Sequence, residues 1–154
     1  MRGEISNAEV FGLPFKLDGC STQGKAAYLI SMQNEAASID STGICWLCSS
    51  YRIGKTNQLN DLNLVTGADY TWEDFMKAGE RIWCLERLFN NRAGFTEADD
   101  TLPRRFLEVP LPDGPAKGSV ARLGEMIFEY YLLRGWTSRG EPTKAKLQEL
   151  EIEV

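Results

Sequence analysis

Residues 40–45, with the sequence DSTGIC, place a carboxylate, a glycine turn and a thiol close together in the chain. The Asp40 carboxylate can accept hydrogen bonds from amide or amino groups of a ligand. The backbone at Gly43 can approach a flat ligand because it has no Cβ, and the Cys45 sulfur can bind a soft metal. The alternative from the same residues is a helix C-cap followed by two buried cysteines, Cys45 and Cys48.

The remaining cysteines leave several chemistries open. Cys45-x-x-Cys48 is half of a zinc or iron–sulfur site, but Cys20 and Cys84 do not form a second pair in sequence. A site made from all four cysteines is geometrically possible. A dithiol redox centre would lack the βαβ surroundings of thioredoxin-like proteins. The chain contains no histidine, which excludes Ser-His and Cys-His dyads and the commonest zinc ligand within it.

The composition predicts a globular protein. The chain has 154 residues, of which 43% are hydrophobic and 25% charged, so we expect a single domain over residues 1–154. The net charge is −5 with scattered Lys and Arg, which argues against nucleic acid or a membrane surface as partner. No apolar run approaches the ~20 residues of a membrane span. Without a signal-peptide core, the expected location is the cytoplasm.

Apolar residues at helical spacing predict an all-α, multihelical fold with long, proline-containing connections. The first helix should follow caps at Ser21 or Thr22. Residues 1–23 should form an irregular apolar lead-in that lies against something else. The expected segments are a helix at 24–38, a short helix at 44–51, irregular chain at 54–70, a long helix at 71–92, a short turn after Thr96, extended chain at 101–117, a helix from Ser119 to Gly135 and a last helix after Thr143.

The long helix at 71–92 has the clearest signals. Thr71 and Asp74 form a capping-box pattern, and Gly94 follows as a terminator. Cys84 should be a small hydrophobe on the packed flank. The acidic pair Asp99 and Asp100 is expected on a solvated face, and the aromatic residues Trp83, Tyr130 and Tyr131 are expected in the core. The predicted buried stripe of this helix consists of Phe75, Gly79, Ile82, Glu86 and Phe89.

The motif Asp40-x-x-Gly43-Ile44-Cys45 resembles the second pterin-binding motif of the aldehyde:ferredoxin oxidoreductases. Ile44 stands where leucine is usual in that family. The resemblance covers nearly the whole chain in order, and it is to the C-terminal part of the family. It continues through ERIWCLERLFN at 80–90, GFT at 94–96, DDTLPRRF at 99–106, GPAKG at 114–118, EYY at 129–131 and RGW at 134–136.

The resemblance implies roles for four residues. Asp40 would accept hydrogen bonds from one pterin, and the backbone of Gly43 and Ile44 would pass beside it. Cys45 would be the fourth ligand of a four-iron four-sulfur cluster and also accept from the pterin. Hydrogen bonds of this kind tune cluster potentials. The cofactors of the whole enzyme would be a tungsten (or molybdenum) bis-pterin and that cluster.

The function implied by the resemblance is oxidation of aldehydes to carboxylates, with ferredoxin as the electron acceptor. The family's β-rich pterin-cradling domain and the other three cluster cysteines do not occur in this sequence. We therefore expect an inactive fragment whose partners are the missing N-terminal domains, ferredoxin and an aldehyde. The alternative is a non-catalytic all-α binding or assembly module.

Overall fold

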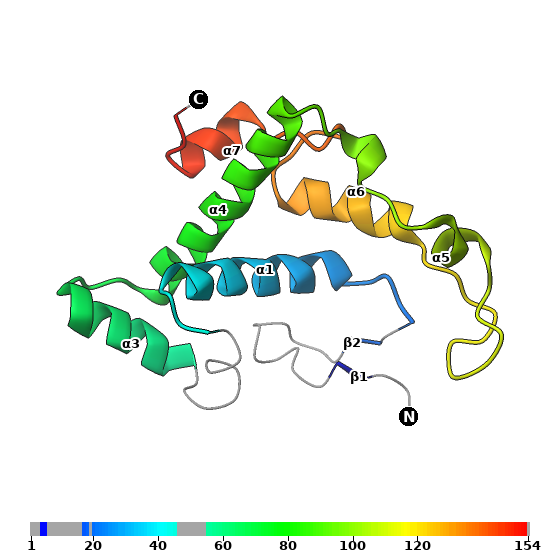
Figure 1. The fold of residues 1–154 in the computed structure, drawn as a ribbon, viewed down its shortest axis with the longest axis horizontal. Coiled ribbons are helices and arrows are strands. Elements are labelled where there is room, and N and C mark those ends of the chain that lie inside the picture. Colours follow the sequence, from blue (N-terminus) through cyan, green and yellow to red (C-terminus); the bar gives the residue numbers. More distant parts are fainter. Residues whose placement is uncertain (1–3, 6–16, 19, 46–54, 154) are drawn as a thin grey trace.

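A computed structural model describes residues 4–5, 17–18, 20–45 and 55–153, and in this part the chain is predominantly helical (Figure 1). The only strands in the described part are β1 (Glu4–Ile5) and β2 (Leu17–Asp18), which pair antiparallel. The all-α expectation is confirmed. The helices are α1 (Lys25–Ser41), α3 (Lys55–Thr66), α4 (Trp72–Arg92), the 3-10 helix η3 (Glu97–Asp99), α5 (Arg104–Glu108), α6 (Leu123–Leu133) and α7 (Lys144–Glu149).

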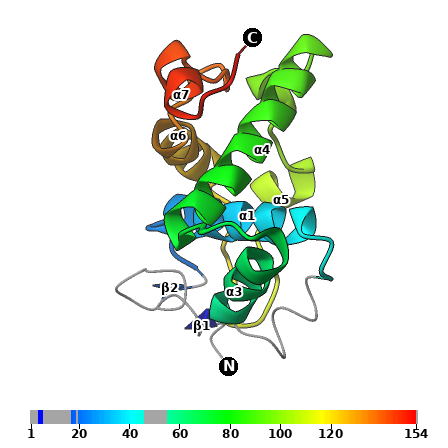
Figure 2. The same cartoon turned by 90° about the vertical axis from the view of Figure 1, so that its left-hand side faces the viewer.

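Helices α1 and α4 cross and make the most extensive contact between described elements (Figures 1 and 2). Their backbones meet at Gly79, where an added Cβ would lie 1.9 Å from the carbonyl oxygen of Asn34. Only glycine permits this approach. On either side of it, the Ser38 hydroxyl donates to the carbonyl of Phe75, and the Trp83 indole donates to the carbonyl of Gln33 at 2.9 Å. The two helices therefore hold each other in one fixed register.

Helix α4 forms where the sequence predicted it. The Thr71 hydroxyl accepts from the Asp74 amide at 3.2 Å, and the Asp74 carboxylate accepts from the Thr71 amide at 2.8 Å. The Thr71 hydroxyl also donates to the Asp74 carboxylate at 2.6 Å, and this bond, followed by the one from the Thr71 amide, lowers the pKa of Asp74 by favouring its charged form. The helix ends at the C-cap Ala93, followed by Gly94 at φ +98°. The predicted capping box and terminator are both confirmed.

The buried face of α4 differs from the predicted stripe in its second half. Phe75, Gly79 and Cys84 are buried as expected. Phe89, however, is 72% exposed, and Glu86 is also exposed, so their predicted burial is wrong. Arg87 occupies the buried position instead, because it pairs with Asp100. The spacing of apolar residues within one helix cannot reveal an ion-pair partner that lies outside that helix.

The start of α1 also differs from the prediction. The helix spans Lys25–Ser41 rather than 24–38, and its N-cap is Gly24 in a left-handed conformation without a side-chain cap. The predicted caps act elsewhere. The Ser21 hydroxyl accepts from the Gln23 amide, and the Thr22 hydroxyl donates to Glu125 on α6. Thr22 therefore anchors the segment before α1 to α6.

Helix α3 replaces the irregular chain predicted for 54–70. Gln58 is buried, and Leu59 and Leu62 are half-buried, although the segment is rich in Asn and Asp, which are poor helix formers. The Asn63 side-chain amide bonds both backbone groups of Tyr70, each at 2.9 Å, which ties the end of the helix to the next loop. Leu64, by contrast, is 82% exposed.

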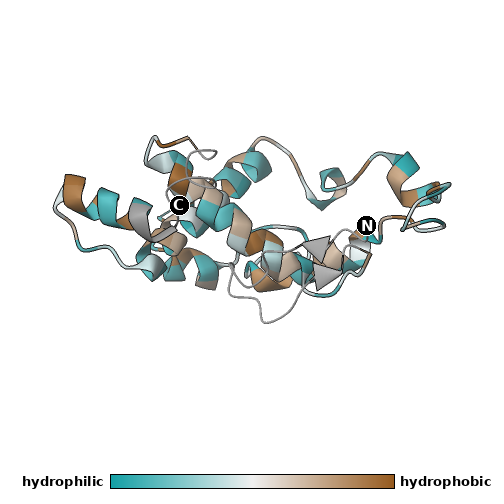
Figure 3. Ribbon diagram, turned by 90° about the horizontal axis from the view of Figure 1, so that it is seen from below, coloured by the Kyte–Doolittle hydropathy of each residue, from teal (hydrophilic) through white to brown (hydrophobic). Residues whose placement is uncertain are grey.

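The later connections contain one unexpected helix. Helix α5 interrupts the chain predicted to be extended at 101–117, starting directly after Pro103. Helix α6 begins at Leu123 with Arg122 as N-cap, so Ser119 is not its cap. The predicted stop at Gly135 and the start after Thr143 are confirmed. On the ribbon coloured by hydropathy, hydrophobic and hydrophilic residues follow one another along the helices (Figure 3).

Two sequence predictions fall on segments outside the described residues. Most of the apolar lead-in at 1–23 lies there, as do residues 46–51 of the predicted short helix. Its first residues, Ile44 and Cys45, are described and are not helical. Among the described helices, none combines the length and the apolar character needed to cross a membrane.

Candidate functional site

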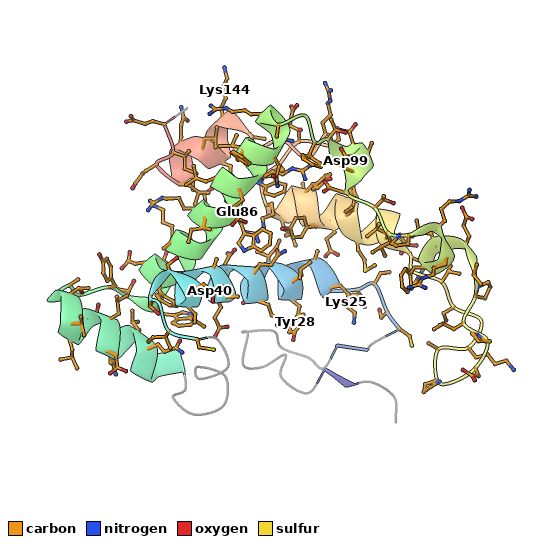
Figure 4. The ribbon with its side chains drawn as sticks, in the orientation of Figure 1. Lys25, Tyr28, Asp40, Glu86, Asp99 and Lys144 are labelled. Atoms are coloured by element: carbon orange, nitrogen blue, oxygen red, sulfur yellow. The ribbon has the colours of Figure 1, made fainter. Side chains whose placement is uncertain are left out.

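The motif residues gather at the C-terminal end of α1. Asp40 lies in the last turn of the helix, whereas the predicted helix ends at residue 38 (Figure 4). Thr42 is the C-cap, and its amide donates to the carbonyl of Ile39 at 2.9 Å. The Gly43 amide donates to the carbonyl of Asp40 at 3.1 Å, and Gly43 adopts φ +77°. That conformation favours glycine and turns the chain sharply away from the helix axis.

The side chains that carry the predicted chemistry are accessible. Asp40 and Cys45 are both exposed, and Cys45 is a free thiol. A Cβ added at Gly43 would meet no atom within 4 Å, so the space beside this backbone is open. No hydrogen bond to the Asp40 carboxylate or to Cys45 is made within the described part of the chain. The Asp40 carboxylate, the Gly43 backbone and the Cys45 thiol are therefore accessible to a ligand.

The turn projects from a firmly held helix end. Ser38 and Ile39 are buried, at 2% and 3% exposure, and Ser38 bonds to Phe75 on α4, whereas the next residue, Asp40, is exposed. The Ser38–Phe75 hydrogen bond and the close approach at Gly79 fix this last turn. Successive residues of a helix point in different directions, so the buried residue Ser38 and the exposed residue Asp40 lie only two positions apart.

The other cysteines do not join Cys45 in the described structure. Cys84 is 2% exposed on α4, which confirms its prediction as a small core residue. Its burial, and secondarily the nearby Glu80, raises the pKa of the thiol and keeps it protonated. Cys48 lies outside the described residues. No group of three or more His, Cys, Asp or Glu side chains suited to a metal ion occurs among the residues that are described.

The exposed position of Cys45 bears on the alternative reading of the motif. The alternative was a helix C-cap followed by two buried cysteines. Cys45, the first of the two, is exposed and so does not match it. The residues present fit the group that the motif implies, because the Asp40 carboxylate, the Gly43 backbone and the Cys45 thiol are each exposed within six consecutive residues. Asp40 could accept from a pterin, and Cys45 could ligate a metal.

A second feature, which the sequence did not predict, is a cavity of about 520 Å³ bordered by α1, α4 and α6. Arg87 and Asp100 meet at its wall, with nitrogen–oxygen distances of 2.9 and 2.7 Å across the pair. The Arg87 Nε also donates to the carbonyl of Gly140 at 2.6 Å. Asp100 was expected on a solvated face, and this ion pair contradicts that expectation. The sequence pattern around either residue does not reveal the Arg87–Asp100 ion pair, because the two residues lie on different elements.

Tyr131 completes this cluster. Its hydroxyl donates to Asp100, and the guanidinium carbon of Arg87 lies 5.8 Å from the centre of its ring. Burial, and then the Asp100 hydrogen bond, raises the pKa of Tyr131 to about 12. Tyr131 therefore stays protonated at neutral pH, and its hydroxyl links α6 to Asp100, which in turn pairs with Arg87 on α4.

A buried arginine ties α6 to α1. Arg134 is 1% exposed, and its guanidinium donates to Asn34 Oδ1 at 2.6 Å and to Gln33 Oε1 at 2.9 Å. It also donates to the Tyr130 hydroxyl at 3.1 Å and lies over the ring of Trp83, 5.8 Å from its centre. These contacts hold α1 from a second side and so fix the helix that carries the motif.

Comparison with known proteins identifies the family to which this chain belongs. A family model described as "Aldehyde ferredoxin oxidoreductase, domains 2 & 3" matches residues 1–152. The chain is 49% identical over 154 residues to a protein of Pyrococcus furiosus named tungsten-containing aldehyde ferredoxin oxidoreductase. It is 46% identical over 154 residues to a protein of the same name from Thermococcus kodakarensis. The alignments cover 99% of this chain and 25% of each relative, so the chain spans about a quarter of their length. The chain therefore belongs to the aldehyde ferredoxin oxidoreductase family, to whose C-terminal part it corresponds.

Proposed function

We propose that this chain supplies the Asp40–Cys45 turn to a tungsten bis-pterin and four-iron four-sulfur site in a larger oxidoreductase. The whole protein would oxidise an aldehyde to a carboxylate and pass the electrons to ferredoxin. The observation that carries the proposal is the exposed, free Cys45 beside the open backbone of Gly43 and the exposed Asp40. Tungsten is favoured over molybdenum because the relatives are named as tungsten-containing proteins.

The residues of the turn would bind and orient the cofactors. Asp40 would accept hydrogen bonds from pterin N–H groups, and the bare Gly43 backbone, with Ile44, would let the ring system lie close. The Cys45 thiolate would complete the ligands of the cluster and accept a hydrogen bond from the pterin, which tunes the cluster potential. The metal–pterin group, when bound, supplies the two-electron chemistry of aldehyde oxidation.

The proposed iron–sulfur cluster needs more cysteine ligands than the described residues bring together. Four cysteines usually hold a four-iron four-sulfur cluster, and Cys45 would be one of them. The rest of the family polypeptide is therefore the proposed partner, and the 154-residue chain by itself should not turn over aldehydes. An aldehyde assay with a viologen dye would test this, since turnover above background would contradict it.

The proposal is tested in the full-length protein by metal analysis and electron paramagnetic resonance. We expect tungsten and iron in the unmodified protein. Cys45→Ser should lose the cluster signal, whereas Cys84→Ala, a matched change at the buried cysteine, should keep it. A full-length protein without tungsten, or a Cys45→Ser variant that retains its cluster, would refute the assignment.

A non-catalytic all-α binding or assembly module is the second candidate. It is favoured by exposed apolar side chains on α4 and α6, namely Phe89 at 72%, Phe128 at 67% and Leu132 at 68%. Under the oxidoreductase proposal, the rest of the polypeptide would cover such surface. A folded full-length protein that binds neither tungsten nor iron would support the module instead.

A further inference from the structure

Thr42 occupies one of the two unassigned positions inside the motif. We propose that Thr42 is a positioning residue, whose hydroxyl fixes the backbone from Gly43 to Cys45 so that the sulfur meets the cluster in one geometry. This inference rests on the proposed function and adds a residue that touches neither cofactor.

The hydroxyl of Thr42 bridges the helix end and the turn. It donates to the carbonyl of Ile39 at 2.7 Å and accepts from the amide of Ile44 at 3.4 Å. A hydroxyl has one proton, and here that proton is committed to Ile39, so its lone pairs face the Ile44 amide. Since Ile39 is 3% exposed, the bridge ties the turn to the buried part of α1.

The bridge compensates for the freedom that Gly43 introduces. Gly43 stands at φ +77° with no contact within 4 Å of an added Cβ, so neighbouring side chains do not restrain it. The hydrogen bond from the Ile44 amide to Thr42 spans this glycine and restricts its rotation. The Ile44 amide is thus engaged by Thr42, whereas the Asp40 carboxylate and the Cys45 thiol on either side of the turn are exposed.

Ser41 provides a matched comparison at the adjacent position. Its hydroxyl donates to the carbonyl of Ala37 at 2.8 Å, one turn back along the helix, and does not reach the turn. Loss of either hydroxyl removes a hydrogen bond at the end of α1. Only loss of the Thr42 hydroxyl releases the chain between Gly43 and Cys45.

The test uses the full-length protein and three variants. Thr42→Val removes the hydroxyl while nearly keeping the shape, Thr42→Ser keeps the hydroxyl, and Ser41→Ala is the control. The measurements are the midpoint potential of the cluster by redox titration, the rate of iron release to a chelator, and the melting temperature. Loss of a supporting contact beside a metal ligand typically weakens binding 10–100-fold.

We expect Thr42→Val to shift the midpoint potential and release iron about 10-fold faster or more. Thr42→Ser and Ser41→Ala should match the unmodified protein in both measurements. The inference is overturned if Thr42→Val lowers the melting temperature without changing potential or iron release, or if Ser41→Ala has the same effect. If the unmodified full-length protein holds no cluster, the proposed function fails and the inference fails with it. A cluster insensitive to Thr42→Val overturns the inference alone.

Discussion

Replacing Gly79 by alanine tests the crossing of α1 and α4 most directly. The new Cβ would lie 1.9 Å from the carbonyl oxygen of Asn34, 2.6 Å from its carbonyl carbon and 2.7 Å from the Ser38 hydroxyl. Two of these three atoms belong to the backbone, so rotation of a side chain cannot relieve the clash. The closest separation must grow from 1.9 to at least 3.0 Å, so the helices must move apart by about 1.1 Å.

The magnitude follows from three terms. Overpacking costs about 1–3 kcal/mol, and the upper end applies because two backbones must move. The displaced helices would weaken the hydrogen bond between Ser38 and Phe75, which contributes about 1 kcal/mol. Alanine is favoured over glycine in a helix by about 1 kcal/mol, which offsets part of this loss. We expect a net loss of about 2–3 kcal/mol in the free energy of unfolding.

Thermal unfolding followed by circular dichroism measures the effect. For a chain of this length, a loss of 1 kcal/mol lowers the melting temperature by about 2–4 °C, so a fall of roughly 4–12 °C is expected. The matched control is Gly124→Ala on α6, where an added Cβ meets nothing within 4 Å. It should leave the midpoint unchanged or raise it. A Gly79→Ala protein that melts at or above the unmodified temperature would show that the crossing is looser than described.

Three further predictions concern single side chains. Phe89→Ala should change the free energy of unfolding by no more than about 0.5 kcal/mol, because Phe89 is 72% exposed, and a denaturant titration showing a loss of several kcal/mol would restore the predicted burial. Tyr131 titrates at about 12 when folded and at 10 in its ordinary state, so the unfolded chain releases this proton first and stability should fall as the pH rises from 10 to 12. The loss is at most about 3 kcal/mol, and melts of Tyr131→Phe should lack this part of the pH dependence; an identical profile would contradict the assignment. In timed alkylation of the native protein, Cys45 should react faster than Cys84, because Cys45 is exposed and burial raises the pKa of Cys84; equal labelling rates would argue against an accessible motif.

The sequence alone determined features that depend on neighbouring residues in the chain. The capping box at Thr71, the terminator at Gly94 and the last helix after Thr143 all rest on backbone groups within a few residues of the signal. The motif from Asp40 to Cys45 was found for the same reason. Its exposure, however, is a property of the folded chain, which no local pattern encodes.

Only the tertiary structure decided which faces are buried. Phe89 carries a large apolar side chain, yet Arg87 takes the buried position because Asp100 and Gly140 supply its hydrogen bonds. Helix α3 forms although it contains several weak helix formers, and it buries Gln58 in place of the irregular chain that the sequence predicted. The burial of Arg87 depends on partners far away in the chain, because a buried charge is accommodated only where such partners compensate its cost.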